Sequence, residues 1–469
     1  MPPSEFVAAS AVADALGELA RAAQRRGRPA LLSATREVEL DDPVAWAFAT
    51  RLATDRWFAW EEPDAGFALA GVGTVAEVIA RGTGRFADVA ASCARLGAGR
   101  LADEPMGLPA GAGLVWVGGF AFDPDGCTAP HFASLPPALM VVPEVAVARV
   151  DGTTYVTAAA EYRPGDDPDG LAERARARLA GLRASALPML DPDPVGPVRV
   201  KSAADPSAYE EAVARAVERI KAGEFRKVVL AREVRAEAPR AHDPAALFGA
   251  LRDLFPSCFC FCVGTPEAAF IGASPELLVR RRGAGAQTVA LAGSTRRSAD
   301  PAVDSHLGEQ LRRSAKNAEE HEIVAQRIER ALRPLAVWVA RARAPELIRV
   351  ANIQHLATPI HAQLADARSA VELAGVLHPT PAVGGEPNDR AVPAIAALEG
   401  FDRGWYAGPV GWMDAAEDGE FCVALRSALL RDRTAHLFAG AGIVADSDPA
   451  SELAETELKL GALLPLLKQ

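Results

Sequence analysis

Short apolar, strand-like runs alternate with helical stretches along the chain, and this alternation limits the possible folds more than any other feature. Strands are expected at Trp57–Trp60, Phe67–Ala70 and Gly113–Phe122, and helices at Ser10–Ala23 and Asp167–Ala184. No run approaches the roughly 20 consecutive apolar residues that a membrane-spanning helix needs. We therefore expect a globular protein with both helices and strands and with no membrane partner.

The composition supplies enough apolar material for a large core. Of the 469 residues, 49% are hydrophobic and 24% are charged, as in a typical soluble globular protein. The formal net charge of −11 argues against a nucleic-acid partner, because such a protein needs a basic face for the phosphates. Met1–Ser10 lacks the basic start and apolar core of a secretory signal, so we expect a cytoplasmic protein.

Three of the six cysteines alternate along a short apolar run. Cys258, Cys260 and Cys262 would lie on one face of a strand. No second pair of cysteine or histidine residues lies at the spacing of a zinc site, so small buried core residues are favoured over a metal cluster.

A proline-dense segment, Leu187–Pro197, divides the sequence into two regions. Residues 1–190 carry no recognisable catalytic constellation, whereas the patterns sharpen in residues 200–469. The second region opens with a predicted helix, in which Ser207 and Glu210 match a capping box and Gly223 marks the end.

Only six of the 50 basic residues are lysines, and Lys227 has the most informative position. Unlike arginine, lysine can lose its proton when it is desolvated. The alternating run Arg226–Val234 predicts a strand with Lys227 on the same face as Val229 and Ala231. This pattern leaves two interpretations open: a solvated lysine at a sheet edge, or a partly desolvated functional lysine.

Two acidic residues beyond this strand are candidates for a function. Glu276 lies in a turn that leads into an apolar strand, where a carboxylate has no evident structural duty. Glu320 lies in a helix predicted over Asp304–Leu332, and taken alone it would form an i, i+4 ion pair with Lys316. The zinc motif HExxH, suggested by His321, fails because its last position is alanine.

The last predicted helix presents acidic residues on one face. Asp448 and Pro449 form its start, and Glu452, Glu455 and Lys459 follow at i, i+3 and i+7. Two carboxylates on one face could hold a magnesium ion whose octahedron is completed by water. From this helix alone, a surface ladder of ion pairs is the favoured interpretation.

The run Gly440–Ala445 matches the dinucleotide-binding pattern GxGxxA in its spacing only. Asp446 and the residues after it stand where a helix should open directly from the glycines, so we reject a nicotinamide site. The glycines still allow the backbone to approach an anionic ligand closely. Arg426, at the end of a strand-like run, could form a two-pronged pair with a carboxylate.

Residues 205–465 as a whole resemble the chorismate-utilising enzymes, a family that includes the isochorismate, salicylate, anthranilate and aminodeoxychorismate synthases. The blocks that carry the resemblance occur in the family's order: Phe225–Arg232, Gly272–Leu277, Leu291–Arg296, Glu320–Glu322, His355–Pro359, His378–Gly385, Phe401–Gly408, Arg426, Phe438–Val444, Glu455–Thr456 and Lys459. The resemblance implies an α+β fold with two stacked, largely antiparallel sheets, flanked by helices, and an active site in the cleft. Residues 1–190 are expected to add strands and helices to the same unit.

The residue at position 227 indicates the subgroup. Family members that deliver ammonia usually carry glutamine there, whereas those that deliver water carry lysine, because water needs a base. Ala382 followed by Val383 is similar to the isochorismate synthases rather than to the salicylate synthases. The resemblance thus implies an isomerase that converts chorismate to isochorismate, for menaquinone or siderophore biosynthesis, without a glutamine amidotransferase subunit. A lyase that forms salicylate or anthranilate, and a non-catalytic chorismate-binding homologue, remain alternatives.

The resemblance also implies catalytic roles. Lys227, uncharged through desolvation, would activate water for attack at ring carbon two. Glu276, kept protonated, would donate to the hydroxyl that leaves ring carbon four. The residues expected to bind the substrate are Gly293, Ser294, His355, Ala382, Tyr406, Arg426, Gly440, Ala441 and Lys459.

Magnesium is the cofactor that the resemblance implies. Glu320 and Glu455 would hold it against the ring carboxylate of chorismate, and Glu452 would act through water. This replaces the ion-pair interpretations that the two helices favour when each is considered alone. Asn317 stands where the family has a further acidic residue, a departure that alters the expected water shell.

Overall fold

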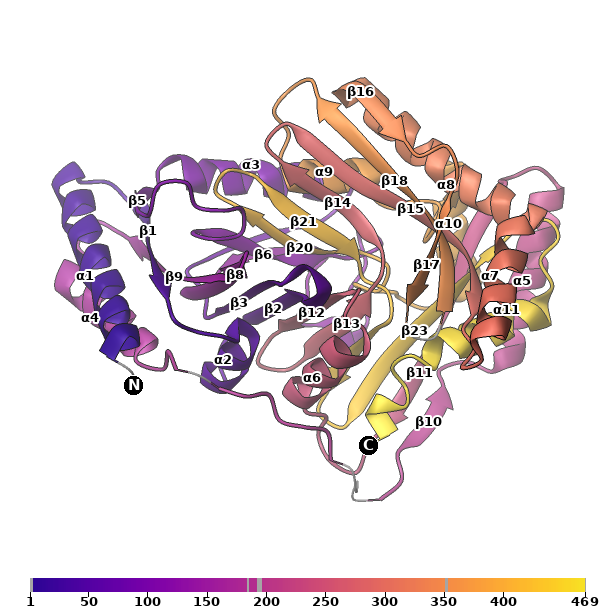
Figure 1. Ribbon diagram of the computed structural model, residues 1–469, viewed down its shortest axis with the longest axis horizontal. Helices are drawn as coiled ribbons and strands as arrows, with labels where there is room; N and C mark the ends of the chain where they lie inside the picture. The colour runs from indigo at the N-terminus through magenta and orange to yellow at the C-terminus, as the bar shows by residue number, and fades with distance from the viewer. Residues whose placement is uncertain (1–2, 184, 192–195, 351–352, 469) are drawn as a thin grey trace.

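Two large sheets form the body of the protein, with helices on their outer faces and at their ends (Figure 1). The computed structural model describes residues 3–183, 185–191, 196–350 and 353–468. Among the described strands, only β1 (Ala30–Val38) and β5 (Leu101–Asp103) pair in parallel. The α+β fold with two largely antiparallel sheets, expected from the sequence, is confirmed.

The first sheet contains 13 of the described strands and runs the length of the molecule. It joins strands from both halves of the chain, because β2 pairs with β12. Its order is β10 (Arg199–Ser202), β11 (Lys227–Glu237), β23 (Thr434–Ile443), β22 (Ser427–Arg431), β13 (Ala269–Ser274), β12 (Phe259–Gly264), β2 (Trp57–Glu62), β3 (Phe67–Val72), β8 (Val145–Val150), β9 (Thr153–Tyr162), β1 and β5, with β19 (Gly385–Glu386) beside β11.

The second sheet contains 10 described strands, and here β20 pairs with β6 from the first half of the chain. Its order is β16 (Ala336–Arg341), β18 (Ile353–Leu364), β15 (Gly285–Arg296), β14 (Leu277–Arg282), β21 (Gly419–Val423), β20 (Pro409–Asp414), β6 (Val115–Phe120), β7 (Ala138–Val142) and β4 (Ala76–Ala80), with β17 (Glu346–Val350) beside β18.

The helices cluster at the two ends of the long axis and along the sheets. Figure 1 shows α1 and α4 at one end, and α5, α7 and α11 at the other. In chain order the described helices are α1 (Pro3–Arg26), α2 (Pro43–Thr50), α3 (Arg85–Ala98), α4 (Pro168–Leu179), α5 (Pro206–Lys221), α6 (Pro244–Leu254), α7 (Pro301–Arg313), α8 (Ala315–Leu332), α9 (Ala370–Leu377), α10 (Asn388–Glu399) and α11 (Pro449–Leu460). None of them has the length and apolarity needed to cross a bilayer.

The strand β12 separates two hydrophobic cores. Phe261 and Val263 belong to the core that also contains Trp60, Trp116 and side chains of both sheets. Its cysteines point the other way, into a second core beneath α1, α2 and α6, where all three are buried and free. The prediction that Cys258, Cys260 and Cys262 are small core residues is therefore confirmed.

Two local predictions were wrong. The helix expected over Asp304–Leu332 is broken at Ser314, which has an extended backbone and caps α8 by accepting a hydrogen bond from the Asn317 backbone. Because of this break the axis of α8 can differ from that of α7, and α8 borders the pocket described below. At the start of α5, Asp205 is the capping residue, because its carboxylate accepts the Ser207 N–H, and no capping box forms.

The start of α11 and the end of α5 agree with the helix boundaries predicted from the sequence. Asp448 caps α11 and Pro449 opens it, as expected. Gly223 has a positive φ of 79° just beyond α5, where the chain turns toward β11. Residues 192–195 of the proline-dense segment, and Ala184 at the end of the second predicted helix, lie outside the described residues.

Packing between the two sheets is expected to depend on Trp412. Its ring is fully buried and stacks on Phe67 with the centroids 5.3 Å apart. Trp412→Ala should lower the free energy of unfolding by about 3–5 kcal/mol, because a large cavity opens in the core. Trp412→Phe should cost less, since it keeps an aromatic ring and removes an indole N–H that has no partner among the described residues. Chemical denaturation measures both; equal losses would contradict this packing account.

Candidate active site

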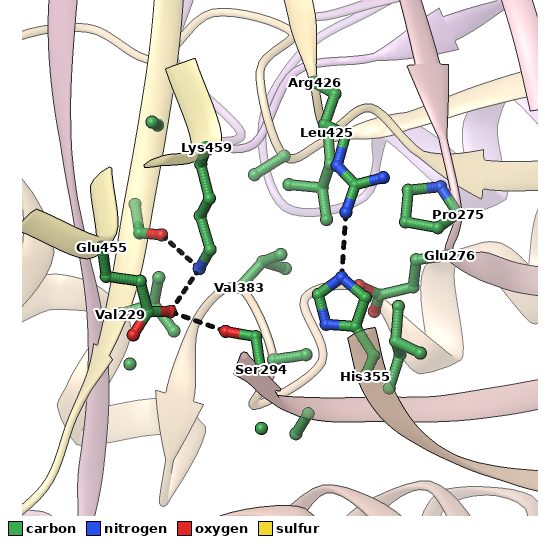
Figure 2. A pocket seen from close by; sticks show the side chains of 18 of the residues that line it. Val229, Pro275, Glu276, Ser294, His355, Val383, Leu425, Arg426, Glu455 and Lys459 are labelled. Carbon is green, nitrogen blue, oxygen red and sulfur yellow. Dashed lines mark hydrogen bonds and ion pairs between the residues drawn. The ribbon is translucent and has the colours of Figure 1, made fainter. Parts of the chain in front are cut away.

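One pocket lies where the two sheets meet α8 and α11, and it encloses about 1010 Å³ of empty space, its open mouth included. Strands β11 and β23 of the first sheet and β15 and β18 of the second supply its walls. Figure 2 shows the side chains that project into it, including Glu276, Arg426 and Lys459. Charged groups that are largely removed from water therefore face one small space.

Lys227, the first residue of β11, is fully buried behind one wall of this pocket. Its Nζ lies 2.9 Å from Oε1 of Glu320, which comes from α8 and lines the pocket. The interpretation of Lys227 as a solvated edge lysine is therefore wrong. Its neighbour in the ladder is Glu386 of β19, a short strand that covers this end of β11.

Gly442 of β23 makes room for the pair of Lys227 and Glu320. A Cβ atom at this position would lie 2.5 Å from Oε1 of Glu320 and 3.0 Å from Cε of Lys227. Contacts under 3.0 Å essentially never occur for real Cβ atoms, so any larger residue would displace the carboxylate. In the sequence Gly442 belongs to a glycine-rich run, and this role could not be assigned to it there.

Glu276 lies in the turn between β13 and β14 and is almost completely buried. Burial raises the pKa of Glu276 to about 8, although the charge of Lys227, a hydrogen bond from Thr380 and the charge of Lys459 act in the opposite direction. The Thr380 hydroxyl donates to Oε1 at 3.4 Å, and the Glu276 backbone N–H donates to the Ser274 hydroxyl at 3.2 Å. This carboxyl group is therefore held in place and retains its proton at neutral pH.

Arg426 carries a buried positive charge with no carboxylate against it among the described residues. One terminal nitrogen donates to Nε2 of His355 at 2.9 Å, and the other, Nη1, has no hydrogen-bond partner in the described part of the chain (Figure 2). Burial, with the charges of Arg426 and Lys459, holds the pKa of His355 well below its usual range. A neutral histidine and an unsatisfied guanidinium together form a site for an anion.

Three carboxylates line the side of the pocket formed by α8 and α11, and each is paired with a lysine. Glu320 contacts Lys227, Glu452 contacts Lys316 at 3.2 Å, and Glu455 contacts Lys459 at 2.8 Å. Glu455 also accepts a hydrogen bond from Ser294 at 3.1 Å (Figure 2). The i, i+4 pair of Lys316 with Glu320 does not form, because Lys316 turns toward α11.

The acidic side of the pocket fits a hard divalent cation in its donor chemistry. All three carboxylates face one space, and each offers oxygen atoms of the kind that magnesium prefers. Burial, and the nearby charge of Glu455, raise the pKa of Glu452, so negative charge is crowded there. Each carboxylate is paired with a lysine, and the group of three potential ligands found within 4.8 Å of one another among the described residues lies elsewhere and is discussed below.

The pocket gathers nearly all of the predicted site residues. Those that line it are Glu276, Gly293, Ser294, Glu320, His355, Ala382, Tyr406, Arg426, Gly440, Glu452, Glu455 and Lys459. Lys227 lies behind the wall, in contact with Glu320. Ala441 does not line the pocket, because the strand pleat turns it away from the face that Gly440 and Gly442 share.

Arg403, which lines the pocket, and Thr380, which contacts Glu276, were not singled out from the sequence. Arg403 is buried, pairs with Glu399, and donates to the backbone oxygens of Val383 and Val229 at 2.9 Å each. Its hydrogen bonds therefore connect two segments that line the pocket. Both residues lie in blocks that carry the family resemblance, which was the available signal, but their partners are far away in sequence.

The comparisons with known proteins decide the family. The chain matches the family model described as chorismate binding enzyme over residues 17–468. It belongs to the chorismate-binding enzymes. The salicylate biosynthesis isochorismate synthase of Pseudomonas aeruginosa is 37% identical over 441 residues, which cover 94% of this chain and 91% of that protein. The isochorismate synthase MenF of Bacillus subtilis is 33% identical, with 93% of each chain covered.

Solved structures of this family share the fold. The menaquinone-specific isochorismate synthase MenF from Escherichia coli aligns with a TM-score of 0.78 at 27% identity, covering 97% of this chain and 99% of that one. Anthranilate synthase component I from Streptococcus pneumoniae aligns with a TM-score of 0.68 at 21% identity, covering 87% of this chain and 93% of that one. The second likeness concerns the fold alone.

Stability should respond to pH through Glu276. Its pKa is raised from 4.5 in the unfolded chain to about 8 in the folded protein, so its ionisation opposes folding as the pH rises between these values. Glu276→Gln removes that opposition. The free energy of unfolding of the variant, relative to that of the wild type, should therefore rise by at most about 1.4 kcal/mol per pH unit over this range. Above this range the difference should stay constant. Urea denaturation at several pH values measures the difference; a difference that does not change with pH would contradict the assignment.

Proposed function

We propose that this chorismate-binding enzyme is an isochorismate synthase, an isomerase that converts chorismate to isochorismate. The observation that carries the proposal is a pocket lined by a buried, protonated glutamic acid, with a buried lysine behind its wall and a guanidinium that has no carboxylate partner in the described part of the chain. The names of the similar proteins from Pseudomonas aeruginosa and Bacillus subtilis support the same activity. The product would enter menaquinone or siderophore biosynthesis; the similar enzyme of known structure from Escherichia coli is described as menaquinone-specific.

Lys227 would act as the general base. As water attacks ring carbon two, the amine takes a proton from it, and the ring double bonds shift toward carbon four. In the structure Nζ contacts Oε1 of Glu320, so the attacking water would have to take over a contact with this amine.

Glu276 would act as the general acid. Its proton passes to the hydroxyl on ring carbon four, which leaves as water. As this carbon–oxygen bond breaks, the shifting ring double bonds form a new double bond to carbon four. One water enters and one leaves, so the reaction is an isomerisation. A pKa of about 8 keeps this acid protonated under neutral conditions yet able to release its proton.

The cationic groups of the pocket would orient the two carboxylates of chorismate. Arg426 has a terminal nitrogen without a partner among the described residues for the enolpyruvyl carboxylate, and Tyr406 lines the same pocket against Gly440. Lys459 and Ser294 lie together on the opposite side, where the ring carboxylate would bind. Two anchors at the ends of the substrate would place its ring between base and acid.

Magnesium would be held by Glu320 and Glu455, with Glu452 acting through water. Such an ion supplies positive charge for the ring carboxylate of the substrate. Glu320 contacts Lys227 through Oε1. A carboxylate has two oxygens, so the second one would serve the ion. Asn317 lies beside Gly293 at the same side of the pocket and offers an amide oxygen in place of a carboxylate.

Replacement of either catalytic group should abolish turnover without unfolding the protein. Lys227→Ala and Glu276→Gln should each lower kcat by at least about 100-fold, because general acid–base groups typically contribute that much or more. The assay incubates protein, chorismate and magnesium and identifies products by chromatography. The exposed residues Lys221 and Glu211 provide matched controls, and Lys221→Ala and Glu211→Gln should retain wild-type rates. A wild-type rate in either site variant, or release of pyruvate as main product, would refute the proposal.

Activity should depend on magnesium through the acidic side of the pocket. Excess chelator should stop turnover, and added magnesium should restore it. Glu455→Gln should raise the magnesium concentration needed for half-maximal rate by about 10-fold or more, because metal-site variants commonly cost that much. Glu457→Gln, on the same helix but facing Arg232, is the control and should leave it unchanged. Full activity in excess chelator would remove magnesium from the account.

A further inference from the structure

A second cluster of potential ligands lies outside the pocket. Glu233 on β11 and His436 on β23 are buried, and His131 reaches them from the short 3-10 helix η2 (Pro130–Phe132). Each offers one ligand atom, and these atoms lie within 4.8 Å of one another. Three segments far apart in the sequence thus converge on one point, while β11 and β23 run side by side (Figure 1).

The atoms of this cluster are near enough to be gathered around one ion. Ligands about 2.0–2.2 Å from a tetrahedral ion are roughly 3.4 Å from each other, so atoms within 4.8 Å of one another must still move closer by side-chain rotation. Nδ1 of His436 lies 2.7 Å from Oε1 of Glu233, and the His131 ring stacks on the His436 ring with centroids 4.1 Å apart. An imidazole nitrogen binds a metal in the plane of its ring, so ligation by both histidines requires one ring to turn out of this stack.

A buried nitrogen without a partner is the independent sign of a ligand. Nε2 of His131 is shielded from solvent and has no hydrogen-bond partner among the described residues. Buried polar atoms are rarely left unsatisfied, because desolvation then goes uncompensated. A bound cation would supply the missing interaction. A simple hydrogen bond between His436 and Glu233 would leave this nitrogen unexplained.

The ligand types select the class of metal. Two imidazoles and one carboxylate suit zinc, whereas magnesium and calcium prefer sites made of oxygen alone. Arg235 donates to Oε1 of Glu233 at 2.7 Å and would have to move from that oxygen. Its side chain is 45% exposed, so it can turn to solvent or remain on the second oxygen of the carboxylate.

We propose that His131, Glu233 and His436 form a zinc site separate from the active-site pocket. Three protein ligands leave a fourth position for water. The site would fasten the segment around η2 to the ladder of β11 and β23. Glu233 pairs across that ladder with Phe438, which lines the active-site pocket, so the ion would also stiffen one pocket wall. This inference does not depend on the reaction that the pocket catalyses.

Zinc binding by tag-free, chelator-stripped protein tests the inference. The protein is dialysed against zinc chloride in an excess of magnesium chloride, which occupies sites made of carboxylates, and bound zinc is measured by atomic absorption. His131→Phe keeps the stacked ring but removes both nitrogens, and should bind one zinc ion fewer per chain than the wild type. His306→Phe, at an exposed helical position, is the matched control and should bind as the wild type does.

Thermal unfolding gives a second measurement. Zinc should raise the Tm of the wild type and of His306→Phe, because an ion that binds only the folded state stabilises it. It should not raise the Tm of His131→Phe or of Glu233→Gln, a second variant that keeps the shape of the side chain. Equal zinc content in the wild type and His131→Phe, or an equal rise in Tm in all variants, would overturn the inference.

Discussion

Burial of the Glu276 carboxyl group is the constraint on which the chemistry of the pocket depends. Water stabilises a carboxylate strongly, and the turn between β13 and β14 removes that water almost completely. The nearby charge of Lys227 works against this effect but does not outweigh it, and the pKa of Glu276 remains raised to about 8. The protein thus keeps an acid ready at neutral pH.

A second carboxyl group in the same pocket shows the opposite balance. Glu455 is partly buried, with 33% of its side chain exposed, yet the charge of Lys459 and hydrogen bonds from Lys459 and Ser294 outweigh burial and hold the pKa of Glu455 below its usual range. One glutamate is therefore neutral and can donate a proton, whereas the other is charged and can face a cation. Such a division of labour between two carboxyl groups is set by their surroundings rather than by their own chemistry.

Much of this arrangement could be predicted from the sequence, and the exceptions have physical causes. The strand pattern around Lys227 shows which neighbours share its face, but not that Glu320 contacts its side chain or that β19 pairs with this end of β11, so the burial of Lys227 was left open. The break at Ser314 escaped prediction because the residues on both sides have helical periodicity. Gly442 acquires its role only when α8 places a carboxylate over β23. The fold itself followed from the family resemblance, while the catalytic and metal-binding roles stay predictions.

Infrared difference spectroscopy of the wild type against Glu276→Gln tests the central claim most directly. The C=O stretch of a protonated carboxylic acid, absent from the variant, should be present in the wild type at pH 7 and disappear as the pH rises through about 8. A band already lost below pH 6 would show that Glu276 is ionised in the working range, and would contradict its role as the acid.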